Sequence, residues 1–465
     1  MNSKTQPYDV LVSMQNKITK EKHNHFRDMM VSSIYSQAEE IANNVVTKSN
    51  KKKIDWDKKL DDILTSRITG YPIMFLLLGL VFFITITGAN VPSALLADFL
   101  FGIEAQLTTF FIKANAPAWL HGILILGMYR TLAWVISVML PPMAIFFPCF
   151  TLLEDLGYLP RIAFNLDRLF KKAGAHGKQS LTMSMGFGCN AAGIIACRII
   201  DSPRERLIAM LTNNFVPCNG RFPTLIAISS IFIGSAVASK YRSIAATFFV
   251  CILVLFGISI TLLVSWGLSK TILKGVPSSF TLELPPYRRP QFGKIIYRSI
   301  IDRTIFVLGR AALVAAPAGL ITWILANVFI GNQSILAHLA AILQPFGRLI
   351  GMDGFILIAF ILGLPANEIV LPILIMSYMA KGSILELDSL NAMGNLFIEN
   401  GWNWLTALNV MIFSLLHFPC ATTLWTIKKE CNSLKWTLFA AIMPTIIAII
   451  TCFIITQGAR IIGLI

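Results

Sequence analysis

Charge is scarce in this sequence: Asp, Glu, Lys and Arg make up 14% of its 465 residues. No Cys-x-x-Cys pair occurs, and the eight cysteines follow no regular spacing, so neither a structural zinc site nor a disulfide framework is indicated. The sequence also lacks His-Glu-x-x-His and Gly-x-Ser-x-Gly, which argues against an intramembrane enzyme of the common zinc or serine type. The first 70 residues are polar and contain no cleavable signal peptide.

Long apolar runs are what the sequence has instead. Hydrophobic residues make up 55% of the chain, and several runs are long enough to cross a hydrocarbon core of roughly 30 Å. The sequence therefore predicts an all-α polytopic membrane protein whose environment is a lipid bilayer.

The basic residues are distributed unevenly along the chain. The formal charge of +15 could indicate a nucleic-acid partner, but thirty of the 39 Lys and Arg residues fall in four segments, against six in the loops between them. This is the positive-inside asymmetry of cytoplasmic loops. We therefore expect no nucleic-acid partner and a cytoplasmic N-terminus. The four segments are residues 1–70, 154–206, 269–303 and 428–435.

The first third of the membrane part is expected to contain two spans. The first lies at about 71–89 and is followed at 93–114 by a segment that looks amphipathic and interfacial. The second lies at 122–153 and should be broken at Pro141, Pro142 and Pro148. The expected domains are a cytoplasmic helical spacer at 1–66, the first span with its external segment at 67–120, a first repeat at 121–268, a basic cytoplasmic linker at 269–303, and a second, inverted repeat at 304–465.

The two repeats follow one plan in opposite orientation. Gly186-Phe-Gly-Cys-Asn190 matches Gly363-Leu-Pro-Ala-Asn367, and Phe215-Val-Pro-Cys218 matches His417-Phe-Pro-Cys420. Each stretch puts Gly or Pro inside an apolar segment, and the basic flanks of residues 181–200 favour a re-entrant hairpin there. We expect an inverted repeat with paired broken helices, whose freed carbonyls and helix ends face a substrate near the midplane.

Thiol, amide and carboxyl groups gather at these breaks. Together they suit a divalent transition ion better than a sugar or an amino acid, although they do not separate Fe(II) from Mn(II) or Zn(II). The candidates for the transport path are Cys189, Cys218, Cys420, Asn190, Asn367 and Glu368, with Met185, Asn214 and His417 as secondary candidates.

Each candidate has a structural alternative. Cysteines and methionines in membrane segments often only pack, and the two asparagines could cap freed backbone groups. Glu368 is the least ambiguous, as ligand or proton acceptor, because a carboxyl group at membrane depth is costly. His417 could be an interior hydrogen-bond partner instead of a ligand. Arg221 is expected to pair with a helix C-terminal end rather than touch a substrate.

Several motifs of residues 60–457 occur in the order of a known family. They include Leu153-Glu-Asp-Leu-Gly-Tyr-Leu-Pro-Arg161, Met185-Gly-Phe-Gly-Cys-Asn190, Asp201-Ser-Pro-Arg-Glu-Arg-Leu207 and Asn367-Glu-Ile369. Here the chain resembles the FeoB family of bacterial ferrous-iron transporters, whose membrane domain carries two Gate repeats. The resemblance implies a permease that moves Fe(II) into the cytoplasm, with Cys189, Cys218 and Cys420 as pore cysteines and no permanently bound cofactor.

The chain departs from that family in one respect, since it has no Gly-x-x-x-x-Gly-Lys-Ser/Thr loop. We expect this polypeptide neither to bind nor to hydrolyse GTP, which would act only through a partner chain. The expected partners are a separate GTP-binding protein, a small accessory protein and further copies of the chain, unless the chain is the membrane part of a longer product.

The alternatives left open are a transporter of Mn, Zn or a nucleoside, and a membrane scaffold whose breaks only pack helices. The lack of Tyr and Trp at the breaks argues against a nucleoside.

Overall fold

The computed structural model of this chain describes residues 30, 33–42, 44–45, 56–66, 68–234, 242–275, 287, 290–380, 382–383 and 390–463. The chain divides into two compact units, and the smaller one comprises Met1–Lys59 with Ser279–Thr281. Its residues 33–42 are helical and exposed. Much of the expected spacer at 1–66 and part of the expected linker at 269–303 lie outside the described residues. The larger unit, Leu60–Ser278 with Leu282–Ile465, holds the membrane part.

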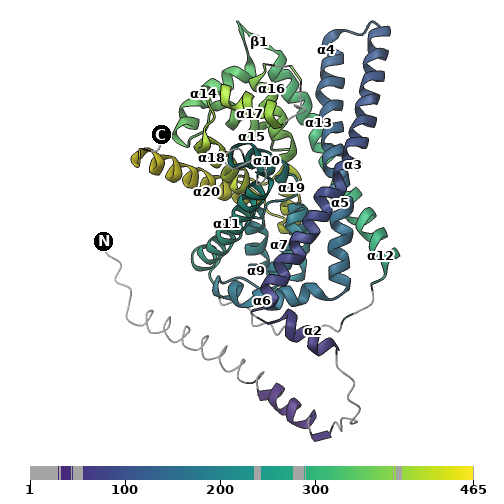
Figure 1. The fold of residues 1–465 in the computed structure, drawn as a ribbon, viewed down its shortest axis with the longest axis vertical. Helices are drawn as coiled ribbons and strands as arrows, with labels where there is room; N and C mark the ends of the chain where they lie inside the picture. Colours follow the sequence, from purple (N-terminus) through teal and green to yellow (C-terminus); the bar gives the residue numbers. More distant parts are fainter. Residues whose placement is uncertain are drawn as a thin grey trace, which may run out of the picture. The chain divides into compact units, whose positions relative to one another are not determined.

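Helices build almost all of the larger unit (Figure 1). The strands in its described residues form one short hairpin, β1 (Phe329–Ile330) with β2 (Gln333–Ser334). In the described part of the chain, six helical runs are long and apolar enough to cross a membrane, or up to seven if the bent pair α14–α15 counts as one. The prediction of an all-α polytopic membrane protein is confirmed. The α-helices are α2 (Trp56–Leu64), α3 (Gly70–Lys113), α4 (Ala118–His121), α5 (Arg130–Asp155), α6 (Tyr158–Lys172), α7 (Gln179–Gly188), α8 (Asn190–Ala196), α9 (Pro203–Thr212), α10 (Phe222–Ile228), α11 (Arg242–Lys270), α12 (Phe292–Tyr297), α13 (Phe306–Asn327), α14 (Ile335–Leu349), α15 (Gly354–Leu362), α16 (Val370–Tyr378), α17 (Leu390–Glu399), α18 (Trp404–Leu416), α19 (Ala421–Cys431) and α20 (Leu434–Ile461).

Shorter 3-10 and π-helical turns connect several of these helices. They are η1 (Gly122–Tyr129), η2 (Cys197–Ile199), η3 (Asn213–Phe215), η4 (Ser229–Ile233), η7 (Arg298–Ile305) and η8 (Asn367–Ile369).

The first two spans differ from the expectation. Helix α3 runs without a break through 93–114, so this segment is not a separate interfacial element; its three charged residues do not make one polar face on an otherwise apolar helix. Helix α5 likewise continues through Pro141, Pro142 and Pro148, and the expected break there is wrong. A proline removes one backbone donor but does not end a membrane helix that neighbouring helices hold in place, and α5 is packed against both α3 and α13.

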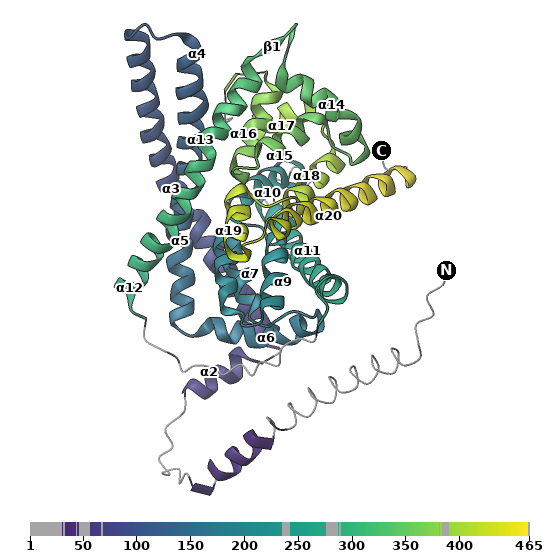
Figure 2. The ribbon, with the colours of Figure 1, turned by 180° about the vertical axis from the view of Figure 1, so that it is seen from behind.

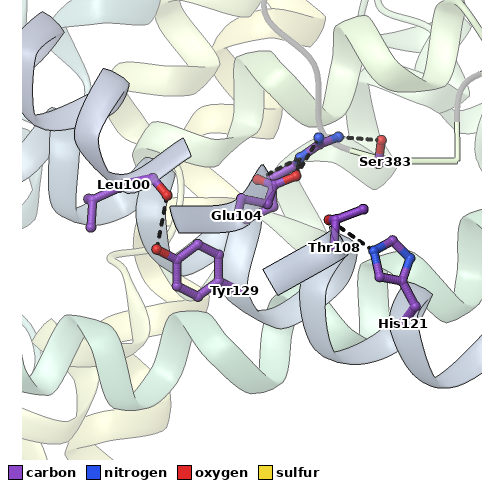
Figure 3. A network of polar contacts seen from close by, with 7 residues as sticks. Leu100, Glu104, Thr108, His121, Tyr129 and Ser383 are labelled. Atoms are coloured by element: carbon purple, nitrogen blue, oxygen red, sulfur yellow. Dashed lines mark hydrogen bonds and ion pairs between the residues drawn. The ribbon is translucent and has the colours of Figure 1, made fainter. Parts of the chain in front are cut away.

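A polar network fastens the far part of α3 to the start of α5 (Figure 3). Arg130 makes an ion pair with Glu104, at 2.6 Å between Nη2 and Oε1, and donates from Nη1 to Ser383 Oγ at 2.8 Å. Tyr129 donates to the Leu100 carbonyl at 2.9 Å, and His121 contacts Thr108 at 3.0 Å. Glu104 is only 6% exposed. The pair therefore satisfies a carboxylate on a long apolar helix and also reaches the segment that follows α16.

Helices near the hairpin turns of the two expected repeats lie in different halves of the larger unit. In Figure 1, α7 and α9 of the first repeat lie in the lower half, whereas α15 and α16 of the second lie in the upper half; Figure 2 shows the same from behind. The breaks expected from Gly and Pro are present: α7 ends before Cys189, α15 before Gly363 and α18 before His417. These breaks bring the candidate residues toward the middle of the unit.

Candidate functional site

Two helical hairpins turn at equivalent residues. In the first, Cys189 separates α7 from α8 with an extended backbone, φ −156° and ψ 126°. In the second, Ala366 precedes η8 with nearly the same angles, φ −151° and ψ 123°. The two halves of the first hairpin lie against each other, since a Cβ on Gly193 would overlap the Thr182 carbonyl oxygen. The backbone thus repeats at the aligned position, although the first repeat has a thiol there and the second a methyl group.

Each Pro-Cys break is hydrogen-bonded to the hairpin of its own repeat. The amide of Asn219 donates to the Gly188 carbonyl at 3.4 Å, and the amide of Ala421 donates to the Leu364 carbonyl at 2.8 Å. Pro217 and Pro419 have no N–H to continue a helix. The backbone is extended at Val216 in the first break, and at His417 and Cys420 in the second. The four breaks therefore form two pairs that meet in one place.

One enclosed cavity of about 30 Å³ lies where the breaks meet. All six primary candidates line it. One water molecule needs roughly 10–15 Å³ of such space, so the cavity has room for about two waters. Its described lining is Met139, Met143, Gly188, Cys189, Asn190, Cys218, Asn219, Gly220, Ala311, Pro365, Ala366, Asn367, Glu368, Cys420 and Thr422.

The polar groups of this cavity make few contacts with one another. Asn367 Nδ2 lies 3.8 Å from Cys218 Sγ, and Asn367 Oδ1 is buried without a hydrogen-bond partner among the described residues. Cys420 Sγ is 3.2 Å from Thr423 Oγ1. The side chain of Asn190 is 3.4 Å from Asn213 Nδ2, so its oxygen already has a partner. Among the described residues, no three His, Cys, Asp or Glu side chains stand close enough together to hold an ion. The described residues therefore provide no preassembled cage of ligands at this cavity.

The structure does not bring the secondary candidates into this cavity. Met185 packs, partly buried, against the apolar core. His417 is 1% exposed; its Nδ1 lies 2.9 Å from the carbonyls of Phe413 and Ser414, and its ring stacks on Phe413. Asn214 donates to the His417 carbonyl at 2.6 Å. Asn214 and His417 therefore belong to a polar cluster beside the cavity.

Sequence reasoning missed the contribution of helices α5 and α13. Met139 and Met143 of α5 and Ala311 of α13 complete the lining, together with Thr422. The pair Pro141-Pro142 lies between Met139 and Met143 and so pointed to the correct part of the chain. It lies within a helix that passes the cavity, and not at a break. Ala311 carries no signal, because an alanine in an apolar helix has no chemistry of its own.

Comparisons with known proteins place these features in a family. The family described as "Nucleoside recognition", named Gate, matches residues 136–232 and 308–434, and "Ferrous iron transport protein B C terminus" matches residues 250–302. The protein named "Fe(2+) transporter FeoB" of Staphylococcus aureus (strain MSSA476) is 30% identical over 432 residues, which are 90% of this chain and 61% of that protein. The chain belongs to the FeoB family.

Other FeoB relatives extend the same match. The Fe(2+) transporter FeoB of Methanocaldococcus jannaschii is 28% identical over 461 residues, 96% of this chain and 65% of the relative. A protein of Porphyromonas gingivalis, named "Fe(2+) transport protein A/Fe(2+) transporter FeoB fusion protein", is 25% identical over 449 residues, 85% of this chain and 51% of the relative. The chain thus spans between 51% and 65% of the length of these FeoB relatives. No solved structure matches it.

The Gate matches coincide with the two FeoB repeats described above. Residues 136–232 contain the hairpin turn at Cys189 and the break at Cys218, and residues 308–434 contain Asn367 and Cys420. Each matched segment therefore holds one hairpin and one Pro-Cys break.

Proposed function

We propose that this chain is a membrane permease that carries Fe(II) into the cytoplasm. The observation that carries the proposal is that four helix breaks, two from each repeat, bring three thiols, three amides and one carboxyl group to one cavity. Relatives that match 85–96% of this chain bear the name Fe(2+) transporter. Sulfur with a few oxygens suits Fe(II) better than Mg²⁺ or Ca²⁺.

In this proposal Cys189, Cys218 and Cys420 bind the ion transiently, and oxygens of Asn190, Asn367 and Glu368 complete its surroundings. The unpartnered Asn367 Oδ1 and the Glu368 carboxylate are the oxygens best placed to do so. Transit requires binding that is weak and spread over several sites. A cavity without a preassembled set of three ligands fits that requirement.

A nucleoside is a second candidate cargo because the Gate family is described as "Nucleoside recognition". The cavity disfavours it on two grounds. Its volume of about 30 Å³ is far below the several hundred Å³ of a typical small-molecule pocket. No aromatic side chain occurs among the described residues of its lining, so nothing there would stack on a base.

The coupling to energy is proposed to come from outside this chain. A separate GTP-binding protein would act on the cytoplasmic helices, and a small accessory protein is a further partner, since one relative is named as a fusion of Fe(2+) transport protein A with FeoB. The proposed location is a bacterial inner or plasma membrane with the N-terminus in the cytoplasm. GTP would act through that GTP-binding unit, whether it is a separate protein or another part of a longer product, and Fe(II) would be the substrate rather than a resident cofactor.

The test is anaerobic Fe(II) uptake into proteoliposomes that contain this chain, with Mn(II), Zn(II) and a nucleoside as competitors. The test variant is Cys218→Ser with Cys420→Ser, and the matched control is Cys251→Ser, an exposed thiol on α11. We expect uptake in the wild type and the control, and loss of uptake in the double variant.

If the wild-type chain alone shows no uptake, the same vesicles receive the GTP-binding partner and GTP. Restored flux would support the permease with external coupling. No flux under either condition, or a double variant as active as the control, would overturn the proposal in favour of another cargo or a scaffold.

A further inference from the structure

Arg221 is a fully buried cation beside the cavity. It lies one residue before α10, is 0% exposed, and follows Gly220, which lines the cavity. Its Nη1 donates to the carbonyls of Asn214 and Leu415 at 2.7 and 2.8 Å. Its Nη2 donates to Asn214 Oδ1 at 3.1 Å and to the carbonyls of His417 and Phe418 at 3.2 Å. One side chain of the first repeat thus binds the end of α18 in the second.

This guanidinium has no acidic partner in the described part of the chain. Its Nε is buried and unpartnered. Cys218, three residues before it, and Cys420 line the neighbouring cavity. Burying a charge without a counter-ion costs several kcal/mol, so a purely structural role should have been filled by a neutral donor.

A neutral donor is in fact already present at the same place. Asn214 Nδ2 donates to the His417 carbonyl at 2.6 Å, and that carbonyl receives Arg221 as well. Capping the end of α18 therefore does not by itself require a positive charge. The partial negative charge of that helix end favours a cation there, and the same positive charge stands beside the cavity lined by Cys218 and Cys420.

The second repeat has no such charge at the matching position. Arg221 follows Cys218 by three residues, and the residue that follows Cys420 by three is Thr423, whose hydroxyl contacts the Cys420 thiol at 3.2 Å. Only the first repeat thus contributes such a charge, and its guanidinium also contacts the backbone of the second Pro-Cys break at His417 and Phe418.

We propose that Arg221 determines the cation selectivity of this path: its fixed positive charge excludes cations that gain nothing from sulfur ligands. This inference rests on the permease function proposed above. A hard monovalent cation such as Na⁺ meets the repulsion of the guanidinium and gains little from thiols and amides. A thiophilic divalent ion offsets the same repulsion through its bonds to sulfur. Positive residues serve as cation barriers in other narrow pores by the same electrostatics.

The experiment compares Fe(II) uptake with Na⁺ leak in proteoliposomes for the wild type, Arg221→Gln and Arg221→Lys. The glutamine variant removes the charge and keeps a hydrogen-bond donor. The lysine variant keeps the charge but lacks the planar guanidinium with its several N–H donors. Arg460→Gln, an exposed charge near the end of α20, is the matched control. Thermal melting and size-exclusion profiles in detergent establish that each variant is folded.

We expect the ratio of Na⁺ leak to Fe(II) uptake to rise by about tenfold or more in Arg221→Gln, and to stay near the wild-type value in Arg221→Lys and Arg460→Gln. A folded Arg221→Gln protein with an unchanged ratio would overturn the proposal. If Arg221→Gln does not fold, Arg221→Lys decides: a leak of Na⁺ through it would show that the charge is not the barrier. Absence of Fe(II) uptake by the wild type, both alone and with the GTP-binding partner and GTP, would refute the permease itself and is distinguished from a changed ratio.

Discussion

The carboxylate of Glu368 lies directly against Cα of Gly220, so close that a methyl group on residue 220 would overlap Oε1. Both residues line the cavity, one from each repeat. The glycine is therefore required by the carboxyl group opposite it and not by a special backbone angle. The carboxylate thereby lies close to Cys218, which is two residues before the glycine and lines the same cavity.

Gly220→Ala should displace Glu368 and impair transport without unfolding the protein. We expect Fe(II) uptake in proteoliposomes to fall by about tenfold, the scale of a misplaced ligating group. Gly267→Ala on α11 is the control, because a Cβ there meets nothing within 4 Å, and it should leave uptake unchanged. Wild-type uptake by a folded Gly220→Ala protein would show that the position of Glu368 is irrelevant to flux.

The shared backbone of Cys189 and Ala366 predicts that the thiol can be moved between repeats. Cys189→Ala alone should reduce Fe(II) uptake by about tenfold, as loss of one ligand does. Because residue 366 has the same extended backbone and lines the same cavity, the double variant Cys189→Ala with Ala366→Cys should recover most of the lost uptake. The measurement is initial uptake rate against Fe(II) concentration. A double variant as slow as the single one would mean that the two positions differ functionally.

The Glu104–Arg130 ion pair should contribute to stability more than an exposed pair does. Glu104 is buried and accepts from both Nε and Nη2 of Arg130 at 3.0 and 2.6 Å, so a double-mutant cycle with glutamine at both positions should give a coupling of about 1–3 kcal/mol. The cycle is measured as unfolding free energy in mixed micelles. The exposed i,i+4 pair Asp167–Lys171 is the comparison, and we expect a coupling below about 0.5 kcal/mol there. Equal couplings would contradict the structural assignment.

Asp61 should make stability depend on acid pH. Burial raises its pKa, but hydrogen bonds from Arg161 and Tyr287 and the guanidinium charge outweigh burial and hold the pKa below the usual 3.8. Since the folded-state pKa is the lower one, the carboxylate stabilises the protein fully above about pH 5, and this contribution is lost as the pH falls through the folded-state value.

The variant Asp61→Asn should therefore destabilise the protein at pH 7 by about 2 kcal/mol, because Arg161 is buried and loses its carboxylate. Thermal melting in detergent should show the gap between wild type and variant shrinking as the pH is lowered below 4. Asp62→Asn, an exposed neighbour, is the control. A gap that stays constant from pH 7 down to the acid limit of folding would exclude this linkage.

Much of the architecture could be predicted from sequence because glycine and proline within apolar runs identify several of the helix breaks. Gly186-Phe-Gly-Cys-Asn190 and His417-Phe-Pro-Cys420 interrupt apolar runs with residues that cannot continue a helix, and the helices end there. The same reasoning misjudged Pro141 and Pro142, since proline alone does not decide whether neighbouring helices hold a membrane helix together. It also misjudged 93–114, where Glu104 looked like part of a polar face but is itself buried and pairs with Arg130, 26 residues further along.

The thiol, amide and carboxyl side chains that line the cavity could be predicted from the sequence, but the apolar residues that line it could not. The thiols and oxygens at the breaks were recognisable because such groups are costly in an apolar segment. His417 carries equally polar chemistry, yet the structure turns its Nδ1 toward its own helix's carbonyls. Met143 and Ala311 line the cavity only because α5 and α13 pass it, and helix packing of that kind leaves no local mark in a sequence.

The size of the cavity has a consequence for the rate of passage. With room for about two water molecules, it cannot hold an ion together with a full shell of six waters. An ion that passes between Cys189 and Glu368 must exchange water for protein ligands on entry and take water up again on leaving. In the proposed permease, ligand exchange at the metal, and not diffusion, would then limit how many ions cross each second, so a metal that exchanges its ligands slowly would block this path even if it bound well.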